Sequence, residues 1–114
     1  MRITGLLLLL VLWASPAQAA GTYYMSGNDV WEVCKEREQN ITGAKLACIG
    51  IVTAFADTTK ASNKACLPDG TNVLQVRDVF TAYLEELPEV RTYPAILLAH
   101  LALSEVWPCP AEGQ

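Results

Sequence analysis

Four cysteines place the strongest constraint on this chain of 114 residues: Cys34, Cys48, Cys66 and Cys109. In a small domain that leaves the cytoplasm, an even number of cysteines is typical of disulfides, which supplement a small hydrophobic core. A metal site is the alternative, but the spacings of 14, 18 and 43 residues contain no Cys-x-x-Cys pair, and His100 is the only histidine. We therefore expect two disulfides, provided that the chain is exported.

The N-terminus indicates export. Arg2 supplies a positive charge, residues 5–13 form an apolar run, and Ala17-Gln18-Ala19 is a small-x-small pattern that signal peptidases recognise. We predict a signal peptide at residues 1–19, followed by a single mature domain at residues 20–114. A transmembrane anchor is the alternative, but the uncharged stretch before the processing site is shorter than the roughly 20 residues that span a bilayer.

The mature chain is acidic. Without Arg2 it holds seven Lys and Arg against twelve Asp and Glu, a formal charge near −5. This balance disfavours nucleic acids and anionic membranes as partners, because both attract clustered basic residues. A basic or neutral protein surface is the better match, although an acidic surface also serves solubility alone.

Four segments show the three- and four-residue spacing of apolar residues that is typical of amphipathic helices. They cover about residues 26–38, about 43–56, a stretch from a cap at Asp69 or Thr71 to Pro88, and about 94–106. No segment alternates like a strand, so the expected fold class is all-α. Residues 43–56 and 94–106 are apolar on nearly every side, which predicts that neighbouring helices bury them.

Local signals predict where these helices begin and end. Ser26 and Asp29 form a capping-box pattern at the start of the first helix. Thr92 followed by Pro94 is typical of the start of the fourth helix. The polar stretch 57–64, with the sequence DTTKASNK, is expected to be a turn-like connection after the second helix.

Short connections predict that the first helix lies antiparallel to the second, and the third to the fourth. Folding the first pair about residue 41 brings Cys34 and Cys48 level, and folding the second pair about residue 88 does the same for Cys66 and Cys109. Four cysteines allow three connectivities, and this symmetry favours Cys34 with Cys48 and Cys66 with Cys109. The expected architecture is a small four-helix domain of two antiparallel helix pairs stapled by two disulfides.

No constellation of catalytic residues emerges from the sequence. His100 lies in an apolar run, LLAHL, where a lone histidine is more often a helix-face or core residue than a general base. The cysteines are expected to be oxidised and unavailable as nucleophiles, and the carboxylates lie at helix ends and on solvated faces. We therefore expect no enzymatic activity, cofactor or metal, and we interpret the chain as a binding protein.

The segment ACIGIVTAFAD, residues 47–57, holds eight apolar residues in eleven. Eleven helical residues span only about half of a bilayer core, so insertion into a membrane is disfavoured. The sister helices and another protein molecule both remain as contacts of this segment. Gly50 and Ala54, which are small and four residues apart, are candidate contacts of a homodimer because they let a second backbone approach closely.

The order of these landmarks resembles the Rap/Tai-type immunity proteins of bacterial type VI secretion systems. The matching stretches are CIGIVTAFAD, CLPDGTNVLQVRDVFTAYLEELPEVR and PAILLAHLALSEVWPCP. Within residues 26–109, the matching positions are Cys48-Ile49-Gly50, Cys66-Leu67-Pro68, Gln75, Tyr83-Leu84, Pro88 and Pro108-Cys109. Ile51 and Ala54 depart from the family pattern, which usually has Tyr at the first position and often Gly at the second.

The resemblance implies an all-helical periplasmic protein, often a homodimer, that binds and neutralises a toxin, typically a peptidoglycan amidase, without catalysis. An immunity protein can block its toxin by inserting a loop, and the acidic link with Glu85, Glu86 and Glu89 is the candidate. The simpler interpretation of these glutamates is a solvated helix end. A small periplasmic chaperone of the acid-stress type and an orphan helical binding protein are the alternative functions.

Overall fold

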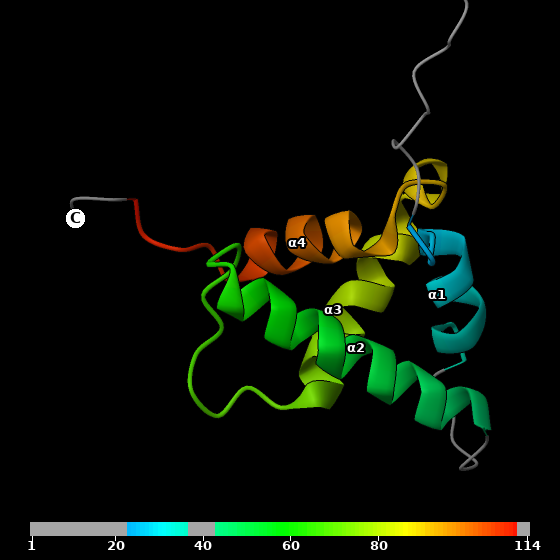
Figure 1. Ribbon diagram of the computed structural model, residues 1–114, viewed down its shortest axis with the longest axis horizontal. Helices are drawn as coiled ribbons and strands as arrows, with labels where there is room; N and C mark the ends of the chain where they lie inside the picture. Colours follow the sequence, from blue (N-terminus) through cyan, green and yellow to red (C-terminus); the bar gives the residue numbers. More distant parts are fainter. Residues whose placement is uncertain (1–22, 37–42, 112–114) are drawn as a thin grey trace, which may run out of the picture.

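The computed structural model describes residues 23–36 and 43–111, and Figure 1 shows their arrangement. They form four α-helices and one 3-10 turn: α1 (Gly27–Cys34), α2 (Gly43–Ala61), α3 (Val73–Glu86), η1 (Pro88–Val90) and α4 (Ala95–Val106). These residues contain no strand, only an isolated bridge between Ser26 and Pro94. The predicted all-α fold is confirmed. The predicted signal peptide at residues 1–19 lies outside the described residues. The first helix ends at Cys34, so its expected end at about residue 38 is wrong.

Each of the four helices contacts the other three. In Figure 1, α2 and α4 both run from right to left, α3 crosses behind α2, and α1 stands at the right, where α4 begins. The expected contacts of α1 with α2 and of α3 with α4 are present, and the contact between α2 and α3 is the most extensive. A single core therefore lies at the centre, where the helices meet.

The core is built from the buried faces of these helices. Its largest fully buried apolar side chains are Phe80, Leu84, Leu98, Leu103, Val30 and Val52. Phe55 packs edge-on against Phe80, with ring centroids 6.0 Å apart. Two threonines are buried with them: Thr81 donates to the Arg77 carbonyl, and Thr59 is hydrogen-bonded to His100. Both buried hydroxyls therefore have partners, as the stability of a core requires.

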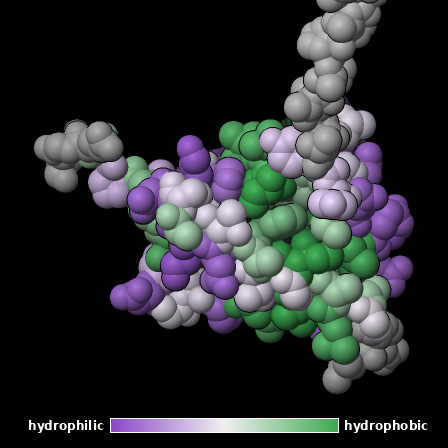
Figure 2. Space-filling model, viewed as in Figure 1, coloured by the Kyte–Doolittle hydropathy of each residue, from purple (hydrophilic) through white to green (hydrophobic). Residues whose placement is uncertain are grey.

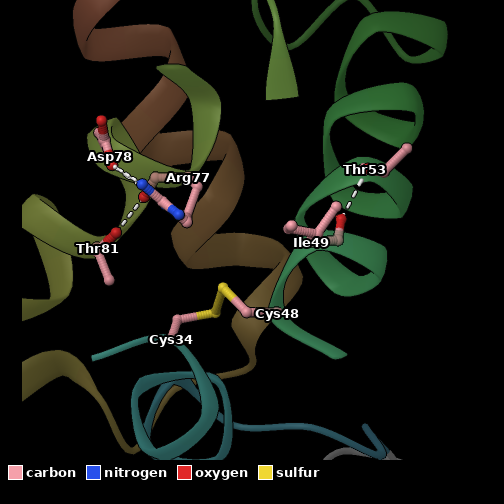
Figure 3. Close-up of a disulfide and its surroundings, with 7 residues drawn as sticks. All are labelled: Cys34, Cys48, Ile49, Thr53, Arg77, Asp78 and Thr81. Carbon is pink, nitrogen blue, oxygen red and sulfur yellow. Dashed lines mark hydrogen bonds and ion pairs between the residues drawn. A yellow bond between two sulfur atoms is a disulfide. The ribbon is translucent and has the colours of Figure 1, made fainter. Parts of the chain in front are cut away.

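Both predicted disulfides are confirmed. Cys34, the last residue of α1, is joined to Cys48 of α2 with Cα atoms 5.1 Å apart (Figure 3), and Cys66 is joined to Cys109 with Cα atoms 4.9 Å apart. The first crosslink is buried in the core. At the second, the Cys66 amide also donates to the Trp107 carbonyl at 2.9 Å. The crosslinks fix the first helix and the end of the last helix to the middle of the chain.

The second helix is longer than predicted, because the stretch expected to be a turn begins as helix. Residues 57–61 continue α2. Side-chain hydroxyls support this part: Thr58 donates to the Ala54 carbonyl, and Ser62 donates to the Thr58 carbonyl one turn back. Thr59 is buried against the other helices. Polar residues did not end the helix, since their hydroxyls bond to it and one of them packs in the core.

The cap of α3 differs from the prediction. Asn72 occupies the N-cap position and forms a capping box with Gln75, so the predicted cap at Asp69 or Thr71 is wrong. The Thr71 hydroxyl instead donates to the Pro68 carbonyl at 2.7 Å and closes the preceding turn. Thr71, which was predicted as a possible helix cap, therefore stabilises the preceding turn instead.

The first turns of α1 and α4 are capped in different ways. The predicted capping box of Ser26 and Asp29 is confirmed, and the Asp29 carboxylate accepts from the Ser26 amide at 2.8 Å. Pro94 occupies the N-cap position of α4 and no side chain caps this helix, so the predicted role of Thr92 is wrong. The Ala95 amide donates instead to the Met25 carbonyl at 3.0 Å. A backbone carbonyl that is distant in the chain therefore accepts from a free amide at the start of this helix, where a side chain is often the acceptor.

The fourth helix is not buried on every side, contrary to the prediction, because Leu97 and Leu101 are 44 % and 55 % exposed. The second helix is not buried on every side either. Its buried residues share one face: Cys48, Val52, Ala56 and Thr59. The opposite face is open to solvent and includes Leu46, which is 60 % exposed. Figure 2 shows hydrophobic residues gathered over the first half of α2 and over α4. In the described part of the chain, no helix is both long and apolar enough to cross a membrane.

Candidate protein-binding site

The acidic link predicted to contact a partner forms a compact turn between α3 and α4 (Figure 1). We refer to residues 85–91 as the acidic turn. Glu85 and Glu86 end α3, Glu89 lies in η1, and all three residues are exposed. Backbone hydrogen bonds close the turn, donated by the amides of Leu87, Val90 and Arg91. The structure therefore gathers the three predicted glutamates on one short, hydrogen-bonded segment.

Arg91 holds the acidic turn against the helices. Its Nε donates to the Leu84 carbonyl at 2.6 Å, and its Nη2 donates to the Glu85 carbonyl at 3.4 Å. These carbonyls lie at the C-terminal end of α3, where a helix has free acceptors and attracts positive charge. The guanidinium also lies 4.1 Å from the centre of the Trp31 ring, a cation–π contact. One arginine therefore fastens the turn to both α1 and α3.

The start of α1 packs against the same turn. The Gly27 amide donates to the Tyr93 carbonyl at 3.0 Å, and the Asn28 amide donates to the Arg91 carbonyl at 2.7 Å. A Cβ atom on Gly27 would lie 2.9 Å from the Cα atom and from the carbonyl oxygen of Arg91, and 2.5 Å from Leu98. Glycine is therefore required for this close approach of two backbones. A turn held in this way is preorganised, so binding through it costs little ordering entropy.

The exposed charges of this region are negative. Arg91 is only partly exposed and is engaged by backbone carbonyls. The pKa of Asp29, at the start of α1, is lowered because the amide and the hydroxyl of Ser26 donate to its carboxylate. Among the described residues, no group of three or more His, Cys, Asp and Glu is placed to hold a metal ion. The arrangement is suited to binding a basic or hydrogen-bond-donating protein surface.

Residues 26–109 match the family model of the Rap1a immunity proteins. The chain belongs to this family. The match runs from the cap of α1 to the last cysteine, so it includes the acidic turn and both disulfides of this Rap1a family member. Neither the curated proteins nor the solved structures contain a significant match. Family membership implies an immunity protein against a secreted toxin, and therefore a non-catalytic inhibitor.

The candidate dimer contact of this Rap1a family member lies on the open face of α2. Gly50 and Ala54 are both exposed, and a Cβ atom on Gly50 would meet nothing within 4 Å. Between them, the Thr53 hydroxyl donates to the Ile49 carbonyl at 2.7 Å (Figure 3), so this polar group is already paired within the helix. Both small residues are thus accessible to a second molecule.

One polar contact in the core was not predicted from the sequence. Thr59 Oγ1 and His100 Nδ1 lie 2.9 Å apart and join α2 to α4. The pKa of His100 is lowered, mainly by burial and also by the positive charge of Lys64. A signal for this contact was present, because Thr59 continues the spacing of Val52 and Ala56 along the buried face of α2. His100 is a partly buried residue with a partner in the core, as its apolar surroundings in the sequence indicated.

Proposed function

We propose that the protein is a periplasmic immunity protein that binds and neutralises a toxin of a type VI secretion system, and that this toxin is a peptidoglycan amidase. The family match over residues 26–109 carries the proposal. Two observations support the location: the signal-peptide pattern at residues 1–19, and two disulfides, which form and persist in oxidising compartments. A toxin that cleaves peptidoglycan acts in the periplasm, so its inhibitor is needed in the same compartment.

The acidic turn is the proposed inhibitory element. Its glutamates are exposed on a backbone that Arg91 and Gly27 hold in place. A preformed turn can enter the groove of a hydrolase and exclude the substrate without any chemistry. Acidic side chains add attraction to a basic rim and speed the encounter of the two proteins.

The proposed assembly is a homodimer through the open face of α2. A two-fold axis sets the same surface of both copies against each other. Gly50 and Ala54 are exposed on this surface, and their small size lets two helix backbones approach closely. Leu46, 60 % exposed on the same face, adds apolar area that such a contact would bury.

Growth and enzyme assays test the function. Candidate toxins are hydrolases that are encoded beside this protein or recovered with it from the periplasm. Such a toxin, expressed in the periplasm, should stop growth, and co-expression of this protein should restore growth and block cleavage of peptidoglycan. Continued toxicity and cleavage would contradict the proposal. Protection of unfolded client proteins at about pH 2 to 3 would instead favour the chaperone alternative.

Charge reversal tests the acidic turn. Lys substitutions at Glu85, Glu86 and Glu89 together should slow association with the toxin about tenfold or more at low salt and should reduce its salt dependence. Glu36→Lys is the control for a charge reversal outside the turn, because Glu36 is an exposed glutamate that lies just after α1. If the triple variant associates like the parent protein at every salt concentration, the acidic turn does not contact the toxin.

A further inference from the structure

A second surface beside the acidic turn combines apolar and acidic residues. α3 and α4 form a groove with a volume of about 370 Å³. Its floor contains apolar side chains from both helices and the ring of Tyr83, with Val79, Ala82 and Ala102 among them. Its rim carries the exposed carboxylates of Asp78, Glu86 and Glu105, and none of the lining residues is basic.

The carboxylates of this groove are only partly neutralised within the protein. Arg77 binds Asp78 through Nε at 3.2 Å and through Nη2 at 3.0 Å (Figure 3). In the part of the chain that the structure describes, no ion pair includes Glu86 or Glu105. Burial raises the pKa of the Tyr83 hydroxyl, and the negative charge of Glu105 raises it further, so this charge acts on the groove itself. An apolar floor strengthens the field of charges that surround it.

We propose that this groove binds a basic amphipathic segment of the cognate toxin, with an apolar side chain on the floor and Lys or Arg side chains at the rim. The proposal extends the proposed function and rests on it. Glu86 belongs to both the groove and the acidic turn, so the two surfaces are continuous. Long basic side chains suit the groove, because their stems pack on apolar surface while their charged ends reach carboxylates. An amphipathic helix in a groove between helices is a common mode of recognition.

A second copy of this chain fits the groove poorly. A two-fold contact through the groove would bring the same three carboxylates of both copies together. Facing like charges repel each other and exclude wrong partners. The whole chain has twelve Asp and Glu against eight Lys and Arg, so it offers few basic segments of its own. These charges favour a basic segment of a different protein.

Single substitutions separate the groove from the acidic turn. Glu105→Gln and Ala82→Leu change the groove alone, whereas Glu89→Gln changes the turn alone. With the toxin that the protein neutralises, we expect Glu105→Gln to weaken binding by about three- to tenfold and to lower its salt dependence. Ala82→Leu fills the floor and should weaken binding on the order of tenfold or more.

The control variants carry the same types of substitution at positions outside the groove. Glu36→Gln and Ala61→Leu alter exposed residues that do not line it, and binding should stay unchanged. Urea unfolding of each variant checks that Ala82→Leu still folds, and Glu105→Gln tests the groove without adding volume. If Glu89→Gln weakens binding while both groove variants bind normally, the groove proposal is wrong and the proposed function stands.

A peptide probe tests the groove without the toxin. The probe is an amphipathic helix of about 18 residues with Leu on one face and Lys on the other, and the control peptide has Glu in place of Lys. In amide NMR spectra of the oxidised protein, the Lys peptide should shift Ala82, Tyr83 and Ala102, and Glu105→Gln should weaken the effect. Shifts on other helices, equal binding of both peptides, or no binding would overturn the proposal. Failure to neutralise every candidate toxin would refute the proposed function, whereas this measurement judges the groove alone.

Discussion

At the scale of single residues, Gly27 decides how closely α1 approaches the acidic turn. A Cβ atom there would lie 2.9 Å from the Arg91 backbone, so Gly27→Ala should lower the free energy of unfolding by about 1–3 kcal/mol. Gly43→Ala is the control, because a Cβ atom on Gly43 meets nothing within 4 Å. Urea unfolding compares the two variants. An unchanged midpoint for Gly27→Ala would show that the turn can move away from α1 at no cost.

His100 makes the stability depend on pH. Its pKa is lowered from the ordinary 6.5, mainly by burial and also by Lys64, so the unfolded chain takes up the proton more readily than the folded protein. The stabilisation is complete above about pH 6.5 and is lost as the pH falls from there toward the folded-state pKa. In the His100→Gln variant, the free energy of unfolding should depend less on pH between about pH 7.5 and 5.5. If the pH dependence of the free energy of unfolding persists in this variant, it arises from other titratable groups and not from His100.

Single residues could be predicted from the sequence where their partners are close in the chain. The capping box of Ser26 and Asp29 joins positions three apart, and its local pattern was sufficient. The contacts of Arg91 with Trp31 and of Gly27 with Tyr93 join distant parts of the chain. No local pattern encodes them, so the sequence identified the glutamates of the turn but not the residues that hold the turn in place.

At the scale of elements, the sequence predicted which segments are helical better than which faces they bury. The spacing of apolar residues revealed all four helices, because this spacing is a property of each segment by itself. Burial depends on how many neighbours a helix has. α2 is apolar nearly all round, yet the other helices cover only the face of Cys48 and Val52. Its open face is therefore a feature that only the three-dimensional arrangement reveals.

The open face of α2 leads to a prediction about assembly. Ala54→Glu would set two carboxylates against each other across a two-fold axis and should convert a homodimer to a monomer. Leu74→Glu is the control, because it adds the same charge at an exposed apolar position of α3, where Leu74 is 46 % exposed. Analytical ultracentrifugation measures the mass of both variants. If Ala54→Glu leaves the mass of the parent protein unchanged, Gly50 and Ala54 do not form the contact.

At the scale of the whole molecule, different helices serve the two proposed contacts. The acidic turn connects α3 and α4, and the groove lies between these two helices, whereas the open face belongs to α2. A protein this small has a modest core, and it is supplemented by crosslinks that close loops of 14 and 43 residues. Restriction of the unfolded chain makes these loops worth about 3 and about 4 kcal/mol. Their sum is comparable with the total stability of a small domain, about 5–15 kcal/mol.

Reduction should therefore unfold the protein in two steps. Thiol alkylation should label Cys66 and Cys109 first, because Cys66 is exposed and Cys109 partly so, whereas Cys34 and Cys48 are 3 % and 2 % exposed. Circular dichroism should show most of the helical signal lost when the buried pair opens. Incubation with a size-matched analogue that cannot alkylate thiols controls for effects of the reagent alone. A fully reduced protein that keeps its helical signal would show that packing alone maintains the fold and that the crosslinks are not needed for it.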